Sequence, residues 1–143
     1  MKMKVIVMLA AFALTTSVAT AQELPRKVQN VEVLDLDGNP AKLPYFGEKN
    51  LMIFYVDPDR HKQNEDFTIE LEQNHRAESD NIHGFGVMNL KDAPMVPNGM
   101  ARNMAKKRTA KNGATVLADQ NRILSTAWAL GDCNNQFVLM IVS

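Results

Sequence analysis

The clearest pattern of hydrophobic and polar positions is a continuous apolar run, Leu51–Val56, with polar residues on either side. The run is rich in strand-forming residues and too short for a buried helix, so it predicts a strand buried on both faces. Four further segments have the composition or alternation expected of strands: residues 31–36, 82–90, 114–118 and 136–142. Asp37-Gly38-Asn39 predicts a tight turn, from which residues 41–43 return as a short strand.

Polar segments that favour helices separate these predicted strands. Asp57 suits an N-cap and Pro58 the first helical position, which predicts a helix from Pro58 to His75. A basic helix over Met100–Lys111 and a short helix over Ile123–Leu130 follow. The alternation of strands and helices predicts an α/β fold in which helices pack on a mostly parallel sheet.

The N-terminus has the pattern of a cleavable secretory signal. Lys2 and Lys4 precede a short apolar run, and Ala19-Thr20-Ala21 provides the small residues that a signal peptidase recognises. We therefore expect residues 1–21 to be a signal peptide and residues 22–143 to form one domain that is periplasmic or otherwise exported. No second apolar stretch is long enough to span a bilayer, so stable membrane insertion after cleavage is not expected.

The charge balance and the cysteine count narrow the classes of partner. The chain carries 16 basic and 16 acidic residues, whereas a nucleic-acid partner normally requires a basic surface, so we expect none. The single cysteine, Cys133, cannot close a disulfide within the chain. It is either buried and inert, paired with another molecule, or a free reactive thiol.

Two segments resemble thiol-disulfide oxidoreductases and peroxiredoxins. Residues 33–43 match the opening hairpin of these families, and Phe54 and Tyr55 match the end of their central strand. The two cysteine positions of the thioredoxin-like pattern fall on Asp59 and Lys62, and the threonine and cysteine of the peroxiredoxin pattern are absent. The resemblance implies a thioredoxin-like central sheet with flanking helices that lacks the catalytic cysteine pair.

Further places in the chain match a narrower group. They are Asn64, Val87-Met88-Asn89 with Asp92-Ala93 and Pro97, Val116–Asp119, and Ala127–Leu130. In their order and spacing they resemble the YtfJ-type family of periplasmic thioredoxin-like proteins, which also lack the cysteine pair. This resemblance implies a fold and a compartment, and it brings no activity with it.

The end of the chain departs from the thioredoxin-like pattern. In such proteins the last strand predicted here normally forms a hairpin with a further strand, and a closing helix follows. Only Ser143 follows residues 136–142. We therefore expect the last strand and helix to be missing, through truncation or true absence, which would leave residues 136–142 as an exposed apolar edge.

The segment after the central strand is the first candidate site. A helix N-terminus there would favour anions, and Arg60, His61 and Lys62 add positive charge. One interpretation is a site for a small anion or carboxylate, formed by these three residues together with Asp59. The other is an ordinary capped first turn, because Asp57 and Asp59 would already satisfy the free N–H groups.

Cys133 is the second candidate, since the loop before the last strand faces the same segment in the fold that the sequence resembles. Positive charge from Arg60, His61 and Lys62 would lower the pKa of a nearby thiol and make it nucleophilic. A single-cysteine thiol redox protein acting through Cys133 is therefore the enzymatic alternative. A free cysteine without a function is the other interpretation.

Metal and cofactor binding have little support in the sequence, and we expect neither. The histidine spacing fits no compact metal motif. Met95, Met100 and Met104 would suit copper(I), but this spacing is also how an amphipathic helix fills a core. Lys106-Lys107-Arg108 forms a basic helix face, which is either a contact for an acidic partner or lipid headgroup or an ordinary solvated surface.

Together these patterns favour a binding protein over an enzyme. Dithiol catalysis needs two thiols at the junction between the central strand and the first helix, and Asp59 and Lys62 cannot replace them. We therefore predict an exported thioredoxin-like domain without dithiol redox activity. Its expected partner is an envelope protein or a small ligand. The resemblance in fold does not identify that partner, because a fold by itself does not assign a function.

Overall fold

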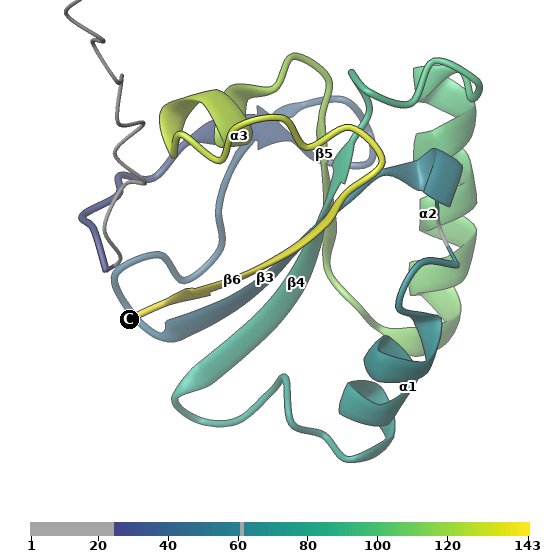
Figure 1. The fold of residues 1–143 in the computed structure, drawn as a ribbon. Helices are drawn as coiled ribbons and strands as arrows, with labels where there is room; N and C mark the ends of the chain where they lie inside the picture. The colour runs from purple at the N-terminus through teal and green to yellow at the C-terminus, as the bar shows by residue number, and fades with distance from the viewer. Residues whose placement is uncertain (1–24, 61) are drawn as a thin grey trace, which may run out of the picture.

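A computed structural model describes residues 25–60 and 62–143 and places the predicted strands in one sheet (Figure 1). The predicted signal peptide and His61 lie outside the described residues. The elements, in chain order, are β1 (Glu32–Leu34), β2 (Pro40–Lys42), β3 (Asn50–Val56), the 3-10 turn η1 (Pro58–Arg60), α1 (Glu65–Gln73), β4 (Ile82–Asn89), α2 (Asn98–Asn112), β5 (Val116–Asp119), α3 (Ile123–Ala127) and β6 (Phe137–Val142).

The sheet is mixed, with strand order β2-β1-β5-β4-β3-β6. Only β3, β4 and β5 run parallel to one another, while β1, β2 and β6 are antiparallel to their neighbours. The prediction of a mostly parallel sheet was therefore wrong outside the centre. The hairpin is one reason, because strands joined by a tight turn must be antiparallel. Asp35 stabilises that turn, since its Oδ1 accepts hydrogen bonds from the backbone N–H groups of Asp37 and Asn39, both at 2.9 Å.

The two faces of the sheet are covered by different helices, α3 on one side and α1 with α2 on the other (Figure 1). We call them the α3 face and the α1–α2 face. Leu51, Ile53 and Tyr55 of β3 point to the α3 face and are fully buried, whereas Phe54 and Val56 point to the other face and are only partly buried. The central strand therefore has one buried face and not the two that were predicted.

The predicted helix from Pro58 to His75 is divided in two. The backbone N–H of Arg60 bonds to the carbonyl of Asp57, which closes the 3-10 turn η1, and α1 begins only after Asn64, which adopts a left-handed conformation with φ 57°. No residue of α1 is buried, and Phe67 is 42% exposed. The thin apolar face of this segment explains why the helix is short and weakly packed.

The short third helix is anchored by its tryptophan. Trp128 is buried, and its Nε1 donates a hydrogen bond of 2.8 Å to the carbonyl oxygen of Gln29. This confirms the packing of the predicted 123–130 segment, although α3 itself ends at Ala127. Trp128 thus ties the end of α3 to the segment that leads into β1.

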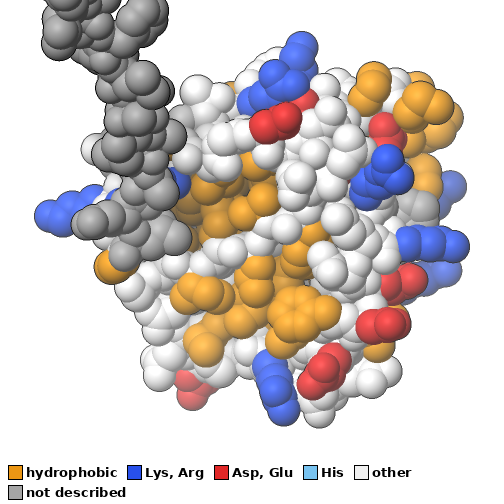
Figure 2. Space-filling model, in the orientation of Figure 1, with side chains coloured by type: hydrophobic (Ala, Val, Ile, Leu, Met, Phe, Trp, Pro, Cys, Tyr) orange, Lys and Arg blue, Asp and Glu red, His pale blue; other side chains and the backbone are white. Residues whose placement is uncertain are grey.

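Strand β6 is an edge of the sheet and pairs with β3 along its length. Its Leu139 and Ile141 point to the α1–α2 face and are 38% and 65% exposed. Figure 2 shows hydrophobic side chains gathered along β6 and the strands beside it. No helix within the described residues is long and apolar enough to cross a membrane.

Candidate functional site

The parallel strands β3, β4 and β5 end at one edge of the sheet, and a buried polar side chain stands at the end of each. Asp57 follows β3, Asn89 ends β4 and Asp119 ends β5, and all three are buried. In open α/β sheets ligands bind outside the carboxyl ends of the strands. We call this region the carboxyl edge, and it is the first place to look for chemistry.

Both carboxylate oxygens of Asp57 accept hydrogen bonds that hold two loops together. Its Oδ1 accepts a hydrogen bond of 2.9 Å from the backbone N–H of Asp59, and its Oδ2 accepts one of 3.0 Å from the backbone N–H of Asn135. Arg60 adds a third link, because its Nε donates to Asn135 Oδ1 at 2.8 Å. These bonds join η1 to the loop before β6.

Three of the four residues predicted to bind an anion lie around one shallow hollow. Asp59, Arg60 and Lys62 line it together with Gln63 and Asn135, and its volume is about 460 Å³. His61, the fourth predicted residue, lies outside the described residues. The hollow brings both signs of charge together, since Asp59 faces it as well as the two cations.

The helix N-terminus on which the anion prediction rested is not found at Pro58. The turn η1 is three residues long, and the first turn of α1 carries Glu65 and Asp66, whose charges repel an anion. Asp59 Oδ2 accepts a hydrogen bond of 3.4 Å from the backbone N–H of Met95, and its Oδ1 is buried without a partner among the described residues. A ligand at Asp59, Arg60, His61 and Lys62 stays a prediction without that support.

Asn89, Asp92 and Arg122 form a polar network at the end of β4. Asn89 Nδ2 donates to Asp92 Oδ2 at 2.7 Å, and Arg122 Nε donates to Asp92 Oδ1 at 2.9 Å, with a second bond from Arg122 Nη2. The hydrogen bonds from Arg122 are the main cause that lowers the pKa of Asp92 below its usual value. This buried carboxylate is therefore held ionised and fully paired.

Asp119 caps α3 and binds Tyr55. Its Oδ1 accepts the backbone N–H of Ile123 and its Oδ2 that of Leu124, both at 2.9 Å, so it satisfies the first two free N–H groups of the helix, whose N-cap position is held by Arg122. The Tyr55 hydroxyl donates to Asp119 Oδ2 at 3.1 Å. Burial is the main reason that the pKa of Tyr55 is raised above its usual range.

The sequence interpretation missed this network, although a signal was present. Asp57 and Asp119 each follow directly on an apolar strand segment, and Asp92 follows closely on another. Acidic residues in such positions meet at the carboxyl edge when the strands are parallel. The interpretation treated Asp57 as the N-cap of the first helix, and Asp92 and Asp119 as loop or turn residues, and it did not bring them together.

Cys133 is buried, at 2% exposed, within the hydrophobic core of the α3 face. Burial is the main cause that raises the pKa of its thiol, and Asp92 and Asp132 raise it further. Arg122 acts in the opposite direction, but it is already paired with Asp92. The expectation that Arg60, His61 and Lys62 would lower this pKa is not met: the pKa is raised, and burial is the reason.

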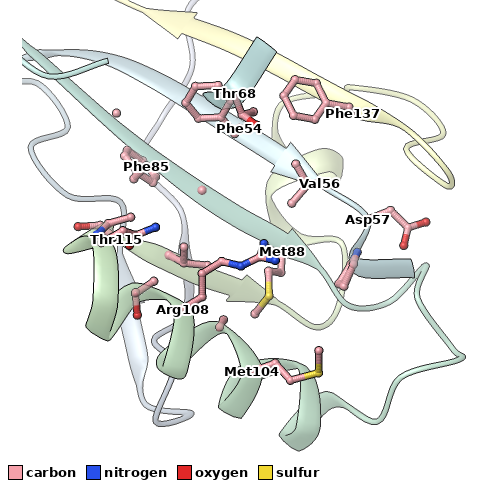
Figure 3. A pocket seen from close by; sticks show the side chains of 18 of the residues that line it. Phe54, Val56, Asp57, Thr68, Phe85, Met88, Met104, Arg108, Thr115 and Phe137 are labelled. Atoms are coloured by element: carbon pink, nitrogen blue, oxygen red, sulfur yellow. Dashed lines mark hydrogen bonds between the residues drawn. The ribbon is translucent and has the colours of Figure 1, made fainter. Parts of the chain in front are cut away.

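A second candidate site is a cavity of about 430 Å³ between the sheet and the helices of the α1–α2 face (Figure 3). Phe54, Val56, Met88 and Phe137 line it from the strands, with the aromatic rings of Phe54 and Phe137 6.1 Å apart. Its volume is within the range of small-molecule pockets, which are mostly apolar with a few polar groups. No pattern in the sequence indicated this cavity, because it arises from how α1 and α2 stand off the sheet.

The methionines around α2 do not fill a core. Met95, Met100 and Met104 are 83%, 55% and 61% exposed, so the expectation that they pack an amphipathic helix was wrong. The helix approaches the sheet instead through the small residues Ala101 and Ala105. The described part of the chain contains no cluster of three or more histidine, cysteine, aspartate or glutamate residues that could hold a metal ion.

Comparison with known proteins identifies the fold. No family model matches the chain, and no curated protein matches it. Among solved structures, the exposed lipoprotein thioredoxin of Streptococcus pneumoniae aligns with a TM-score of 0.55 at 14% identity, over 80% of this chain and 88% of that one. The fold is thioredoxin-like.

Two further structures agree with this assignment. A secreted thiol-disulfide isomerase from Corynebacterium glutamicum has a TM-score of 0.51 at 14% identity, over 82% of this chain and 70% of that one. A thiol-disulfide oxidoreductase from Bacteroides fragilis has a TM-score of 0.51 at 9% identity, over 82% and 83% of the two chains. At these identities the similarity establishes the thioredoxin-like fold that was predicted.

Proposed function

We propose that this chain is an exported thioredoxin-like domain that binds a small ligand or an envelope protein and does not catalyse dithiol–disulfide exchange. The observation that carries the proposal is its single cysteine, Cys133, which is buried in the core. Dithiol exchange proceeds through a thiolate that attacks a disulfide and a second thiol that resolves the intermediate. One buried thiol performs neither part.

The loop that follows β3 supports the same conclusion. Asp59 and Lys62 occupy the positions that the resemblance assigns to the two cysteines, and Asp59 is tied to the backbone of Met95. Arg60 is tied to Asn135. A loop fixed in this way is suited to present a surface and contains no nucleophilic sulfur.

Export and family membership are parts of the proposal that rest on the sequence. The pattern of residues 1–21 is that of a secretory signal, and the spaced matches around Asn89 and Trp128 resemble the YtfJ-type periplasmic family. Two of the similar structures are of proteins described as exposed or secreted, which is in keeping with an extracytoplasmic domain.

Insulin reduction in the presence of dithiothreitol tests the proposal. We expect the wild-type chain to leave the rate of insulin precipitation unchanged, alongside a thioredoxin that accelerates it. Acceleration by the wild type that disappears in Cys133→Ser would instead establish the single-cysteine redox alternative.

Intact mass and alkylation of Cys133 give a second test. Purified without reductant, the exported chain should show one mass that begins at Gln22 with a free thiol. Because burial raises the pKa of Cys133, iodoacetamide at pH 8 should label the native chain at least about tenfold more slowly than the chain in urea. A disulfide dimer, a small-thiol adduct or equal labelling rates would contradict a buried, inert thiol.

A further inference from the structure

We propose that the cavity of the α1–α2 face binds an aliphatic monocarboxylate, with the hydrocarbon chain among the apolar walls and the carboxylate on Arg108. This inference rests on the proposed binding function and names its ligand class. The cavity of about 430 Å³ adjoins the hollow around Asp59, since Arg60 and Gln63 line both, and Asp57 of the carboxyl edge also lines it.

The walls of the cavity are those of a hydrocarbon site. One wall is apolar and comes from three adjacent strands of the sheet: Phe54 and Val56 from β3, Met88 from β4, and Phe137 from β6. Leu71 of α1 closes another side. Hydrocarbon placed here would gain roughly 25 cal/mol for each Å² of apolar surface removed from water.

Small residues create the space. Gly84 and Gly86 of β4 line the cavity, opposite Ala101 and Ala105 of α2. A Cβ on Gly84 would lie 2.6 Å from the carbonyl oxygen of Ala77, so close approach of the chain requires glycine there. A Cβ on Gly86 would meet only ordinary contacts, at 3.6 Å from Val116 Cγ2. The packing of β4 would therefore accept a larger residue at position 86, and glycine there leaves the space open.

Arg108 supplies a positive charge at this cavity. Figure 3 shows its side chain reaching from α2 across the cavity toward Met88, while the carboxylate of Asp57 points away. Two other cations of α2 have partners: Lys106 pairs with Asp37, and Arg102 Nη1 donates to Gln120 Oε1 at 3.2 Å. None of the ion pairs among the described residues includes Arg108.

The guanidinium of Arg108, which has no ion-pair partner among the described residues and lies beside apolar walls, favours a ligand with one anionic end. The guanidinium offers a planar fork that matches a carboxylate, and Arg108 is exposed, so a ligand can reach it from solvent. Glu72 also lines the cavity, from α1. Its negative charge disfavours a ligand with several anionic groups, so a monocarboxylate fits better than a di- or triphosphate.

Titration calorimetry of the full chain with decanoate tests the inference, with decanol as an uncharged probe of the same length. We expect saturable binding of decanoate and binding of decanol that is at least about tenfold weaker. Arg108→Gln should weaken decanoate binding by a similar factor. Lys107→Gln, which removes the neighbouring exposed cation that does not line the cavity, should leave it unchanged.

Two variants that fill the cavity complete the test. Gly86→Leu places a side chain in the space above β4, and Ala105→Leu places one there from a helix that tolerates leucine well. Either variant, if it keeps the wild-type circular dichroism, should abolish binding of decanoate. The second variant keeps the test decisive if the first does not fold.

The possible failures are distinguishable. Absence of decanoate binding to the wild type, equal binding of decanol, or unchanged binding by Arg108→Gln would overturn the assignment of this cavity, and the proposed non-dithiol function would stand. Reduction of insulin by the wild type would overturn the proposed function whatever the result with decanoate.

Discussion

The two faces of the sheet show how differently one strand can be used on its two sides. On the α3 face, Ile53 and Tyr55 are fully buried and meet Leu124 and Trp128 in a continuous core. On the α1–α2 face, Phe54 borders a cavity, and Ile141 is 65% exposed on the same side of the sheet. Because successive side chains of β3 point to opposite faces, Ile53 and Phe54 lie in different environments although they are adjacent in the chain.

The difference shows where stability and binding capacity lie. The α3 face closes tightly because its helix is anchored by two buried groups, the capping carboxylate of Asp119 and the indole of Trp128. The helix α1 has no buried residue, and α2 approaches the sheet only through alanines. A packed face stabilises the fold, and a loosely covered face leaves room for a ligand.

Truncation of adjacent residues on β3 gives the largest expected contrast. Ile53→Ala should lower the free energy of unfolding by about 2–5 kcal/mol, because it removes buried methyl groups and leaves a cavity in a closed core. Phe54→Ala should cost less than Ile53→Ala although it removes more atoms, since its side chain already borders empty space. Urea unfolding with equal m-values measures both. A larger loss for Phe54→Ala would show that the α1–α2 face is as tightly packed as the other.

Asp92→Asn should have an intermediate effect that depends on pH. The variant loses the charge that pairs with Arg122, which we expect to cost about 1–3 kcal/mol at pH 7. Because folding lowers the pKa of Asp92, its stabilisation is present above the ordinary value of 3.8 and is lost as the pH falls below it. The unfolding free energy of the variant should therefore fall less steeply below pH 3.8 than that of the wild type.

A matched control separates this effect from the loss of any carboxylate. Asp80→Asn removes an exposed aspartate and should leave the acid slope unchanged. Asp35 also has a lowered pKa, through the backbone N–H of Asn39, so part of the slope should remain in Asp92→Asn. Parallel slopes for wild type and Asp92→Asn would mean that the network does not contribute to acid stability.

The smallest expected effect is on the exposed edge. Ile141→Thr keeps a strand-forming residue and should change the unfolding free energy by less than about 0.5 kcal/mol. It should also reduce concentration-dependent association, which light scattering measures, because it removes an exposed apolar side chain from an edge strand. Met140→Thr, one residue earlier, points into the core of the α3 face and should be clearly more destabilising. Equal effects of the two would contradict the assigned faces of β6.

The sequence predicted most of the fold, and each success has a local cause. The run at Leu51–Val56, the turn at Asp37–Asn39 and the basic segment of α2 appear where the pattern put them. The first helix was predicted too long, because proline after Asp57 is compatible with a 3-10 turn as well as with an α-helix. Local preference does not distinguish the two when the segment has little apolar surface to bury.

The candidate sites were less predictable, because they depend on distances between segments far apart in the chain. Asp57 and Asn135 are joined by a hydrogen bond across 78 positions, and Tyr55 and Asp119 across 64. The lowered pKa of Cys133 on which the enzymatic alternative rested is not found, for the same reason. Its surroundings are set by Asp92, Arg122 and the core, and not by the cations near it in the resembling fold.

The sequence by itself determined the alternation of strands and helices and the single cysteine, because these follow from local composition and spacing. Only the tertiary structure decided which face of β3 is sealed, that Cys133 is buried, and that Arg108 extends over an apolar cavity. Packing between distant elements fixes burial and electrostatic surroundings, and no local pattern encodes how closely α1 and α2 approach the sheet.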